Sequence, residues 1–475
     1  MPGLHTFYDG TTILEPLAQL VGFEVDKLNL VFCQLASFGF AWYYSAFLSP
    51  ATASRTVRLA YPLIVGVSLC YFCYGSAIKH IFGNVAICYA IMRFSPPQYV
   101  HKFVFIFSMG YLVFIHWFRW YIMKEYYIDV TGPIMVIVQK TTTLAFSLHD
   151  GRMKKPEELN EIQKREAISE VPNLLDYLSY LLSFQTILTG PLCFYTDYQK
   201  FITGENLAVD KAKTPNPLRP AITKLAYTVI FLLMLCYFGL VQAETIMEPE
   251  YFALPWYKWW PLFWFVIFMQ RVQYYYAWTL ADAVCNMSGF GFNGYDEQGN
   301  ERWDLVTNVD PWKVETALSF KDTLDGWNIT TMYWLRRVAY DRVKKNYRTI
   351  STYLLSATWH GFFIGYYMTF LTGAIVTVAG RNVRRCVRHR FQSTEFSRRL
   401  YDAITFIATK TALMYTTFPF VTMHLYPGIE LYRRLHFFLH ILGLFAIIAL
   451  PRILPPPPRT RKEEDVRPAD DKKEL

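Results

Sequence analysis

The chain has 475 residues, of which 53% are hydrophobic, 18% aromatic and 18% charged. This balance excludes a disordered chain, a collagen-like chain and a small disulfide-linked scaffold, because these classes contain much less apolar sequence. Lysine and arginine outnumber aspartate and glutamate by 47 to 38, yet long stretches carry almost no charge, which indicates apolar segments separated by charged loops.

The apolar segments predict membrane-spanning helices, since a helix needs about 20 mostly apolar residues to cross a bilayer core of about 30 Å. Residues 28–48 and 225–241 contain no charged residue, and 103–123 contain only Arg119. The other candidate spans are 57–78, 81–93, 132–148, 174–194, 261–284, 351–379, 401–424 and 435–450. We expect an all-α, polytopic membrane protein with about ten or eleven transmembrane helices, because backbone polar groups in lipid must bond within each segment.

The N-terminus and the cysteines add two expectations. Residues 1–22 lack the basic start and compact apolar core of a cleavable signal peptide, so the first span is expected to act as the insertion signal. The eight cysteines lie mostly inside apolar runs. Even Cys70 and Cys73, which have the spacing of a metal or redox pair, lie in an expected span, so we interpret the cysteines as small core residues and expect no metal site.

Charge is gathered into three polar segments and the C-terminal tail. Residues 151–172 carry both signs and predict a solvated surface helix, whereas 286–350 are rich in glycine and aromatic residues and then basic. The arginine-rich loop 381–399 is assigned to the cytosol by the positive-inside rule, which explains it better than nucleic-acid binding does. Residues 1–454 then form one multi-span domain, and 455–475 form a charged tail that is expected to be disordered and cytosolic.

The last four residues are Lys472-Lys473-Glu474-Leu475. Lysines at these two positions resemble the dilysine retrieval signal of endoplasmic reticulum membrane proteins. A solvated run of charges is the alternative interpretation. With a cytosolic tail, the signal predicts a multi-pass protein of the endoplasmic reticulum membrane.

His360 is the first candidate functional residue, because it lies inside the apolar run 351–379. An ionisable side chain in a membrane span is a functional hypothesis by default. Loss of water disfavours the charged imidazole, so we expect a neutral ring that can accept a proton. A purely structural hydrogen bond is the alternative.

Asn328 lies upstream, at a separation that allows the chain to turn and return to the same chamber. It stands between Trp327 and a segment that carries Arg336 and Arg337. Asn328-Ile-Thr also matches the N-glycosylation sequon, as does Asn286-Met-Ser. If the basic residues are cytosolic, Asn328 cannot be glycosylated.

Four motifs occur in order along this part of the chain. They are Arg271-Val-Gln-Tyr274-Tyr275-Tyr-Ala-Trp278, Trp303-Asp304, Trp327-Asn328, and Trp359-His360-Gly361 with Gly365-Tyr366. In this combination the chain resembles the membrane-bound O-acyltransferases, and within them the lysophospholipid acyltransferases of phospholipid remodelling. Gln273 stands where that branch has lysine, and Ile364 where it often has proline. The resemblance covers most of 140–450 and includes Gly190-Pro191.

The resemblance implies a helical bundle around a catalytic chamber that acyl-CoA enters from the cytosol and a lysophospholipid enters through the membrane. It implies that His360 and Asn328 are the catalytic pair. His360 would act as general base on an acceptor hydroxyl, and Asn328 would position substrate or stabilise the oxyanion. Direct transfer is favoured over a cysteine-linked acyl-enzyme. Acyl-CoA is the expected co-substrate, and no permanently bound cofactor is expected.

The other motif residues are candidate substrate-binding residues, each with a structural alternative. The candidates are Arg271, Tyr274, Tyr275, Trp303, Asp304, Trp327, Trp359, Tyr366 and Arg336. Arg271 could instead extend to the membrane surface, and Asp304 could orient Trp303 or Arg302. Arg336 could contact the phosphates of coenzyme A, but the positive-inside rule predicts it equally well.

The predicted function is transfer of a fatty acyl chain from acyl-CoA to the free hydroxyl, the sn-2 position, of a lysophospholipid. Lysophosphatidylcholine, lysophosphatidylethanolamine and lysophosphatidylserine are the candidate acceptors, and the bilayer itself is the partner surface. An acyltransferase for a sterol, a diacylglycerol or a protein would use similar chemistry, and a polytopic transporter is the rival outside the enzymes. The motifs do not specify a head group or an oligomeric state.

Overall fold

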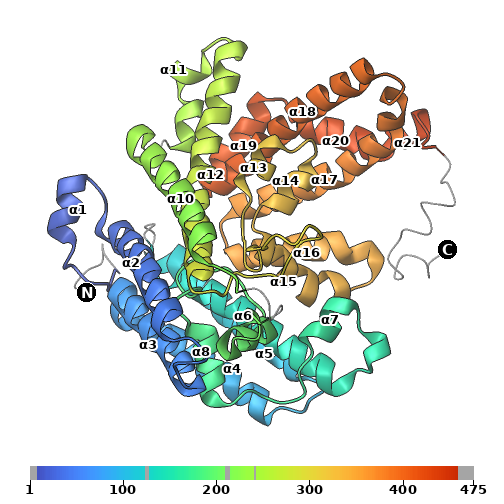
Figure 1. Ribbon diagram of the computed structural model, residues 1–475. Coiled ribbons are helices and arrows are strands. Elements are labelled where there is room, and N and C mark those ends of the chain that lie inside the picture. Colours follow the sequence, from blue (N-terminus) through green and yellow to red (C-terminus); the bar gives the residue numbers. More distant parts are fainter. Residues whose placement is uncertain (1–7, 124–127, 209–213, 240–241, 458–475) are drawn as a thin grey trace.

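The computed structural model describes residues 8–123, 128–208, 214–239 and 242–457, and within these ranges it contains helices and no extended strand (Figure 1). The α-helices are α1 (Glu15–Val21), α2 (Val25–Phe47), α3 (Arg55–Tyr74), α4 (Ile78–Phe94), α5 (Val100–Phe118), α6 (Thr131–Met153), α7 (Glu161–Glu166), α8 (Leu174–Leu182), α9 (Tyr195–Thr203), α10 (Leu218–Phe238), α11 (Pro249–Phe252), α12 (Trp256–Met287), α13 (Pro311–Thr316), α14 (Phe320–Gly326), α15 (Ile329–Val338), α16 (Arg348–His360), α17 (Ile364–Val387), α18 (Glu395–Thr422), α19 (Leu425–Arg434), α20 (Phe438–Ile448) and α21 (Leu450–Ile453). The expected all-α class is confirmed.

The helices form two groups that meet at α15 and α16. In Figure 1, α2 to α8 occupy the lower part of the molecule and α17 to α20 the upper right, with α15 and α16 between them. The largest buried cluster belongs to the first group and extends to Trp334 of α15 and Trp359 of α16. A second cluster joins the start of α12 to α18 and α19 through Phe263, Phe418 and Leu431. The histidine and asparagine motifs therefore lie where the two groups pack together.

The number of expected spans is not confirmed. Among the described residues, four segments are long and apolar enough to cross a membrane, namely Val25–Phe47, Arg55–Phe94, Val100–Ile122 and Leu218–Phe238. The pair Leu425–Arg434 and Phe438–Ile448, bent by 73°, would make five. The expectation was about ten or eleven, at about 20 apolar residues each. Two expected spans, 57–78 and 81–93, share the one 40-residue segment Arg55–Phe94.

The expected span 174–194 is wrong as a continuous helix. α8 ends at Leu182, and the chain then passes through turns to α9. The buried ammonium group of Lys140, on α6, explains the early end. It donates hydrogen bonds to the carbonyls of Tyr180 and Leu181 and to the hydroxyl of Thr186. The last carbonyls of a helix lack partners within it, so a buried cation satisfies them while they solvate its charge.

The polar segment 151–172 is also not one surface helix. It forms a short 3-10 turn, Pro156–Glu158, and then the six-residue α7, which begins with a capping box at Asn160. Glu166, at the end of α7, is buried and pairs with Arg165. A proline and a polar cap divide the segment because each interrupts the helical hydrogen-bond ladder.

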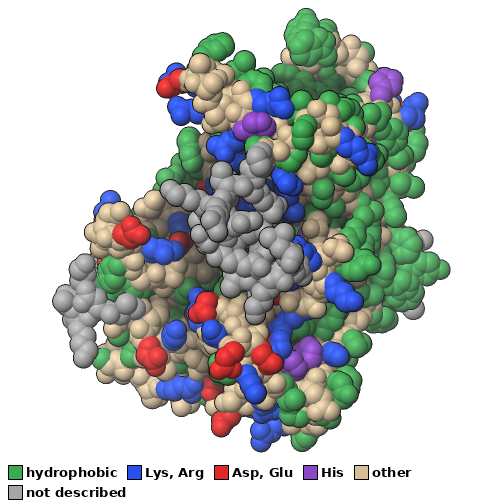
Figure 2. All heavy atoms as spheres, turned by 90° about the vertical axis from the view of Figure 1, so that its right-hand side faces the viewer, with side chains coloured by type: hydrophobic (Ala, Val, Ile, Leu, Met, Phe, Trp, Pro, Cys, Tyr) green, Lys and Arg blue, Asp and Glu red, His purple; other side chains and the backbone are tan. Residues whose placement is uncertain are grey.

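The surface carries both apolar and charged regions. Figure 2 shows hydrophobic side chains along one edge of a face of the molecule, with lysine, arginine and acidic side chains over other parts of it. Large apolar side chains such as Phe94 and Tyr237 are each 84% exposed. Such a surface fits helices that contact lipid.

All eight cysteines are free, and seven of them are buried. The charged tail and its dilysine-like end lie almost wholly outside the described residues.

Candidate active site

His360 is the last residue of α16, and two glycines shape the chain around it. Gly361 ends the helix with φ +126°, a conformation that side chains rarely adopt. The backbone amide of Gly365 donates to the carbonyl of Met423, and a Cβ added at Gly365 would overlap the carbonyl oxygen of Pro419. α17 can therefore approach the end of α18 only with glycine at 365. The spacing of the histidine motif follows from this close packing.

The imidazole of His360 is held in one tautomer. Its Nδ1 lies 2.7 Å from the carbonyl oxygen of Ser356. Since a carbonyl can only accept, Nδ1 must carry the proton, and the neutral ring keeps its lone pair on Nε2. No described side chain or backbone group is bonded to Nε2. The geometry leaves a basic nitrogen free to accept a proton from a substrate.

Aromatic rings surround His360. The nearest are Trp359, Phe370, Phe420 and Tyr366, with centroids 4.7, 5.1, 5.1 and 5.8 Å from the imidazole. They come from three helices, α16, α17 and α18. These rings restrict the orientation of the imidazole and form an apolar wall of the kind that an acyl chain can contact.

Asn328 caps the start of α15 in the left-handed conformation, with φ +50°. Asn308 holds this turn: its side-chain oxygen accepts bonds from the backbone and hydroxyl of Thr330, and its backbone oxygen accepts from Ile329. The backbone amide of Thr330 can only donate, so it fixes the orientation of the Asn308 amide and directs Nδ2 to the Oδ1 of Asn328, at 3.2 Å. The amide hydrogens of Asn328 therefore remain available to a substrate oxygen.

α6 places Asn328 and His360 at the same level of the bundle. Gln139 donates to Thr331 and Trp334 donates to Thr142, so α15 follows α6 turn by turn. One turn before Thr331, Asn328 is then level with about residue 135 of α6. The indole of Trp359 donates to the carbonyl of Met135, at 3.1 Å. Asn328 and His360 therefore both lie near the first turns of α6, although no hydrogen bond between described groups joins them directly.

The α12 motif packs against the asparagine motif. The ring of Trp327 contacts those of Tyr274, Tyr275 and Trp278, with centroids 5.6, 5.8 and 5.1 Å away. Two of the four sequence motifs thus meet through their aromatic side chains. This contact fixes the backbone that leads directly into Asn328.

Arg271 is paired inside the fold. Its guanidinium makes a two-pronged ion pair with Glu315 of α13, at 2.8 and 2.9 Å, and the hydroxyl of Tyr275 donates to the same carboxylate at 2.6 Å. Lys410 of α18 lies 3.7 Å from it. Arg271 is only 3% exposed, so the alternative that it extends to the membrane surface is wrong. Arg271 belongs to an ionic cluster that Tyr275 joins to the aromatic contact.

Trp303, Asp304 and Arg336 have no described hydrogen bond or ion pair with His360 or Asn328. The indole of Trp303 donates to Glu301, and its carbonyl accepts from Lys224, which also pairs with Asp282. Asp304 pairs with Arg302. Burial alone would raise the pKa of Asp304, but hydrogen bonds from Asn293 and Arg302 lower it.

Arg336 lies near Asp341, at 3.6 Å, and its side chain is largely exposed. The second sequon is inaccessible, since Asn286 is fully buried.

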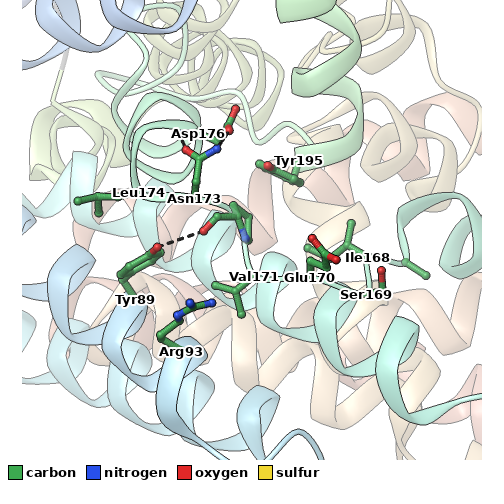
Figure 3. Close-up of a pocket in the computed structure, with 12 residues that line it drawn as sticks. Tyr89, Arg93, Ile168, Ser169, Glu170, Val171, Asn173, Leu174, Asp176 and Tyr195 are labelled. Carbon is green, nitrogen blue, oxygen red and sulfur yellow. Dashed lines mark hydrogen bonds between the residues drawn. The ribbon is translucent and has the colours of Figure 1, made fainter. Parts of the chain in front are cut away.

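A separate cavity lies on another part of the molecule. It has a volume of about 700 Å³ and is lined by Tyr89 and Arg93 of α4, by residues 167–174, and by Tyr195 (Figure 3). The hydroxyl of Tyr89 donates to the carbonyl of Pro172 across it. None of the candidate site residues lines this cavity.

In the described part of the chain, no group of three or more His, Cys, Asp or Glu side chains is placed to hold a metal ion.

Sequence reasoning missed three residues of the arrangement, Asn308, Glu315 and His116, and only His116 carried a signal, as an ionisable side chain inside the expected span 103–123. Asn308 and Glu315 are single polar residues in a loop and a short helix, and only the fold places them beside Asn328 and Arg271. His116 lies on α5 and bonds the backbone of Trp359. No local spacing predicts such partners, which lie between 20 and 243 residues away.

Comparison with known proteins identifies the class. The sequence profile of the membrane-bound O-acyltransferase family matches residues 115–424. This range includes all four motifs and ends at the turn between α18 and α19, on which Gly365 packs. The chain belongs to this family and is an acyltransferase enzyme.

The relatives narrow the class. The chain is 40% identical to Membrane-bound glycerophospholipid O-acyltransferase 1 of Mus musculus, over 93% of each chain. It is 37% identical to the corresponding protein 2 of Homo sapiens, over 93% of this chain and 88% of that one. It is 39% identical to Lysophospholipid acyltransferase 6 of Drosophila melanogaster over 94% of its length, and spans 64% of that relative. The expected membership in the lysophospholipid acyltransferase branch is confirmed.

Proposed function

We propose that this enzyme transfers a fatty acyl chain from acyl-CoA to the free sn-2 hydroxyl of a lysophospholipid, as a step of phospholipid remodelling. Support for the acceptor class comes from the relatives named as lysophospholipid or glycerophospholipid acyltransferases over most of this chain. The observation that carries the chemistry is the tautomer of His360, because a proton on Nδ1 leaves Nε2 as the base.

In the proposed reaction, Nε2 of His360 removes the proton of the acceptor hydroxyl as its oxygen attacks the thioester carbonyl. A new C–O bond forms and the carbonyl oxygen gains negative charge. The amide hydrogens of Asn328 stabilise this oxyanion, the role that is consistent with its Oδ1 being held by Asn308. The C–S bond then breaks, and the sulfur of coenzyme A takes the proton back from the imidazolium.

The remaining candidate residues take supporting roles in this proposal. Trp359, Tyr366 and the phenylalanines around His360 line the acyl-chain path, since they form its apolar wall. Tyr274, Tyr275 and Trp327 hold the asparagine turn. Arg336 remains a candidate for the phosphates of coenzyme A, because its side chain is exposed and basic.

We place the enzyme in the endoplasmic reticulum membrane with its C-terminal tail in the cytosol, on the basis of the dilysine-like end. Replacing Lys472 and Lys473 with alanine should move the full-length protein toward later compartments while activity per molecule stays unchanged. Unaltered localisation of this double variant would remove the signal from the proposal.

A substrate panel tests the proposed acceptor. The full-length protein, purified and reconstituted in lipid nanodiscs, is assayed with saturated and polyunsaturated acyl-CoA. Each donor is combined with lysophosphatidylcholine, lysophosphatidylethanolamine or lysophosphatidylserine. We expect transfer to at least one lysophospholipid, with release of one free coenzyme A thiol per acyl chain transferred. Transfer confined to a sterol or a diacylglycerol under the same conditions would contradict the proposal.

A further inference from the structure

We infer that His116 is a positioning residue for His360, an inference that rests on the proposed function of His360. His116 lies on α5, near the C-terminal end of that helix, and is 5% exposed. It belongs to no sequence motif, and the reaction proposed above does not use it. Its ring nevertheless contacts the backbone on both sides of His360.

The first contact is a hydrogen bond to the residue before His360. Nε2 of His116 lies 2.9 Å from the carbonyl oxygen of Trp359. The carbonyl can only accept, so Nε2 of His116 carries a proton. Carbonyls in the last turn of a helix have no partner within that helix. His116 therefore satisfies a buried group at the end of α16 and fixes the peptide plane that leads into His360.

The second contact is with the residue after His360. A Cβ built on Gly361 would lie 3.1 Å from Nδ1 and 3.2 Å from Cγ of His116. The ring of His116 therefore lies against the Cα of Gly361, where the chain leaves α16 with φ +126°. This contact and the hydrogen bond together hold the residues before and after His360 at one ring.

Two further contacts, one with α6 and one with α15, hold the side chain of Trp359. Its indole donates to the carbonyl of Met135, and its ring packs on Trp334 at 5.6 Å. These contacts orient the side chain of Trp359, whereas His116 alone among the described side chains bonds its backbone carbonyl. Loss of the His116 donor should let the peptide at 359–360 rotate and move Nε2 of His360 away from the acceptor hydroxyl.

A residue that only positions the base should affect the turnover step more than substrate binding, because a misplacement of about 1 Å can cost roughly 100-fold in rate. His116 contacts the backbone around His360 and is not among the rings that we propose to line the acyl-chain path. We therefore expect kcat to fall and KM for acyl-CoA and for lysophospholipid to change little.

The test compares variants that differ in the reach of one N–H group. Glutamine places its amide nitrogen near the position of Nε2, whereas asparagine reaches only to the position of Nδ1, and phenylalanine keeps the ring without a donor. In the reconstituted full-length enzyme, His116→Phe and His116→Asn should lower kcat by roughly 10- to 100-fold, and His116→Gln should restore it to within about fivefold of the wild type.

His80→Phe is the matched control. Nδ1 of His80 bonds the hydroxyl of Tyr111 on the same helix α5, at 2.8 Å, far along the chain from Trp359. The substitution His80→Phe removes a hydrogen bond between a histidine and α5 but leaves the bond to α16 in place. The kcat of this variant should therefore equal that of the wild type. An equal loss in His80→Phe would show that any weakening of α5 lowers activity, and would overturn the inference.

The remaining outcomes separate this inference from the proposed function. Full activity of His116→Phe alongside an inactive His360→Ala would overturn the positioning role and leave the base assignment in place. Equal kcat values for His116→Gln and His116→Asn would overturn the role of the Nε2 donor, even if His116→Phe failed to fold. An active His360→Ala would instead refute the proposed function, and the inference would fall with it.

Discussion

At the scale of single residues, the proposed mechanism depends on which atom of His360 and of Asn328 is left without a hydrogen bond to a described group. The backbone carbonyl of Ser356 accepts a hydrogen bond from Nδ1 of His360, and Nδ2 of Asn308 donates one to Oδ1 of Asn328. What remains is an acceptor nitrogen and a pair of amide hydrogens, which are the two groups that acyl transfer requires. Both arise from neutral side chains, which suits a region where charges are costly.

Asn308 should therefore matter to catalysis even though it touches no reacting atom. Removing its side chain in Asn308→Ala frees the Oδ1 of Asn328 and the backbone amide of Thr330. We expect kcat to fall by about 10- to 100-fold and the variant to be less stable by about 1–3 kcal/mol, the cost of leaving a buried donor unpaired. Steady-state kinetics and thermal unfolding in detergent measure the two effects.

Asn328→Ala gives the comparison for this variant. If Asn328 stabilises the oxyanion, its loss should cost about 100- to 1,000-fold in kcat, as for a single oxyanion donor. A fully active Asn328→Ala would exclude that role, and an Asn308→Ala variant as slow as Asn328→Ala would be expected only if the turn itself collapses.

Glu315 joins two buried cations and is expected to be important for stability. Its carboxylate pairs with Arg271 and lies 3.7 Å from Lys410. In Glu315→Gln both cations lose their counter-charge, so we expect a loss of about 2–4 kcal/mol, lower than for fully buried pairs because Glu315 is 20% exposed. A lower unfolding temperature in detergent would confirm this.

Glu297→Gln, in an exposed loop, is the matched control and should leave the unfolding temperature unchanged. An unfolding temperature for Glu315→Gln equal to that of the wild type would mean that Arg271 and Lys410 are neutralised by other means.

The sequence identified Arg271 and left two explanations for it. Only the fold, which brings α13 beside α12, shows that its partner is an internal carboxylate.

At the scale of elements, close approach of α17 and α18 depends on one glycine. A Cβ at Gly365 would overlap the carbonyl oxygen of Pro419, whereas a Cβ at Gly380, on the same helix, would meet nothing within 4 Å. Gly365→Ala should therefore destabilise the protein by about 1–3 kcal/mol, as overpacking does. It should also lower activity, since Gly365 lies at the start of α17, five residues after His360. Gly380→Ala should be neutral or stabilising by up to about 1 kcal/mol.

Melting curves and turnover of the two alanine variants, measured together, check this prediction. Similar curves for both would show that α17 can move away from Pro419 without cost.

The histidine motif was found in the sequence because its residues are close together, but the reason for its second glycine lies 54 residues further on, at Pro419. Spacing alone does not reveal this kind of contact.

Element boundaries were predicted well for some continuous apolar runs, but the expected span 351–379 is divided at Gly361 between α16 and α17, and another expected span is interrupted where a buried polar group intervenes. The run 28–48 corresponds to α2 and 225–241 largely to α10. The run 174–194 is not one helix because Lys140, 40 residues away from Tyr180, donates a hydrogen bond to the Tyr180 carbonyl at the end of α8. A charge buried in one helix can end another helix, and hydropathy along a single segment does not register that effect.

At the scale of the whole molecule, composition predicted the helical class, whereas the expected number of spans is not confirmed. The described helices include only four or five that meet the length and hydropathy of a membrane crossing. The others bury polar residues against one another, as α6 does with Gln139, Lys140 and residues 141–143. A bundle that encloses a reaction site needs such helices in its interior, and their polar content lowers their hydropathy below that of lipid-facing spans.

The motifs, in contrast, converge as expected from their order. The α12 motif contacts Trp327, and α6 places Asn328 level with the end of α16. Trp303 and Asp304 are exceptions, since their described bonds include those with Glu301, Lys224, Asn293 and Arg302 and none with Asn328 or His360. Resemblance to a family supplied the candidate site residues, whereas the contacts that support them became visible only in the folded chain.

In the proposed mechanism, Nε2 of His360 is the base for acyl transfer. The most direct measurement is single-turnover formation of acylated lysophospholipid by reconstituted wild type, His360→Ala and His389→Ala, since His389 is an exposed histidine in the short 3-10 helix Arg388–Phe391. We expect a rate at least about 100-fold lower in His360→Ala, with unchanged unfolding temperature, and a normal rate in His389→Ala. A His360→Ala enzyme that transfers acyl chains at the wild-type rate would contradict it.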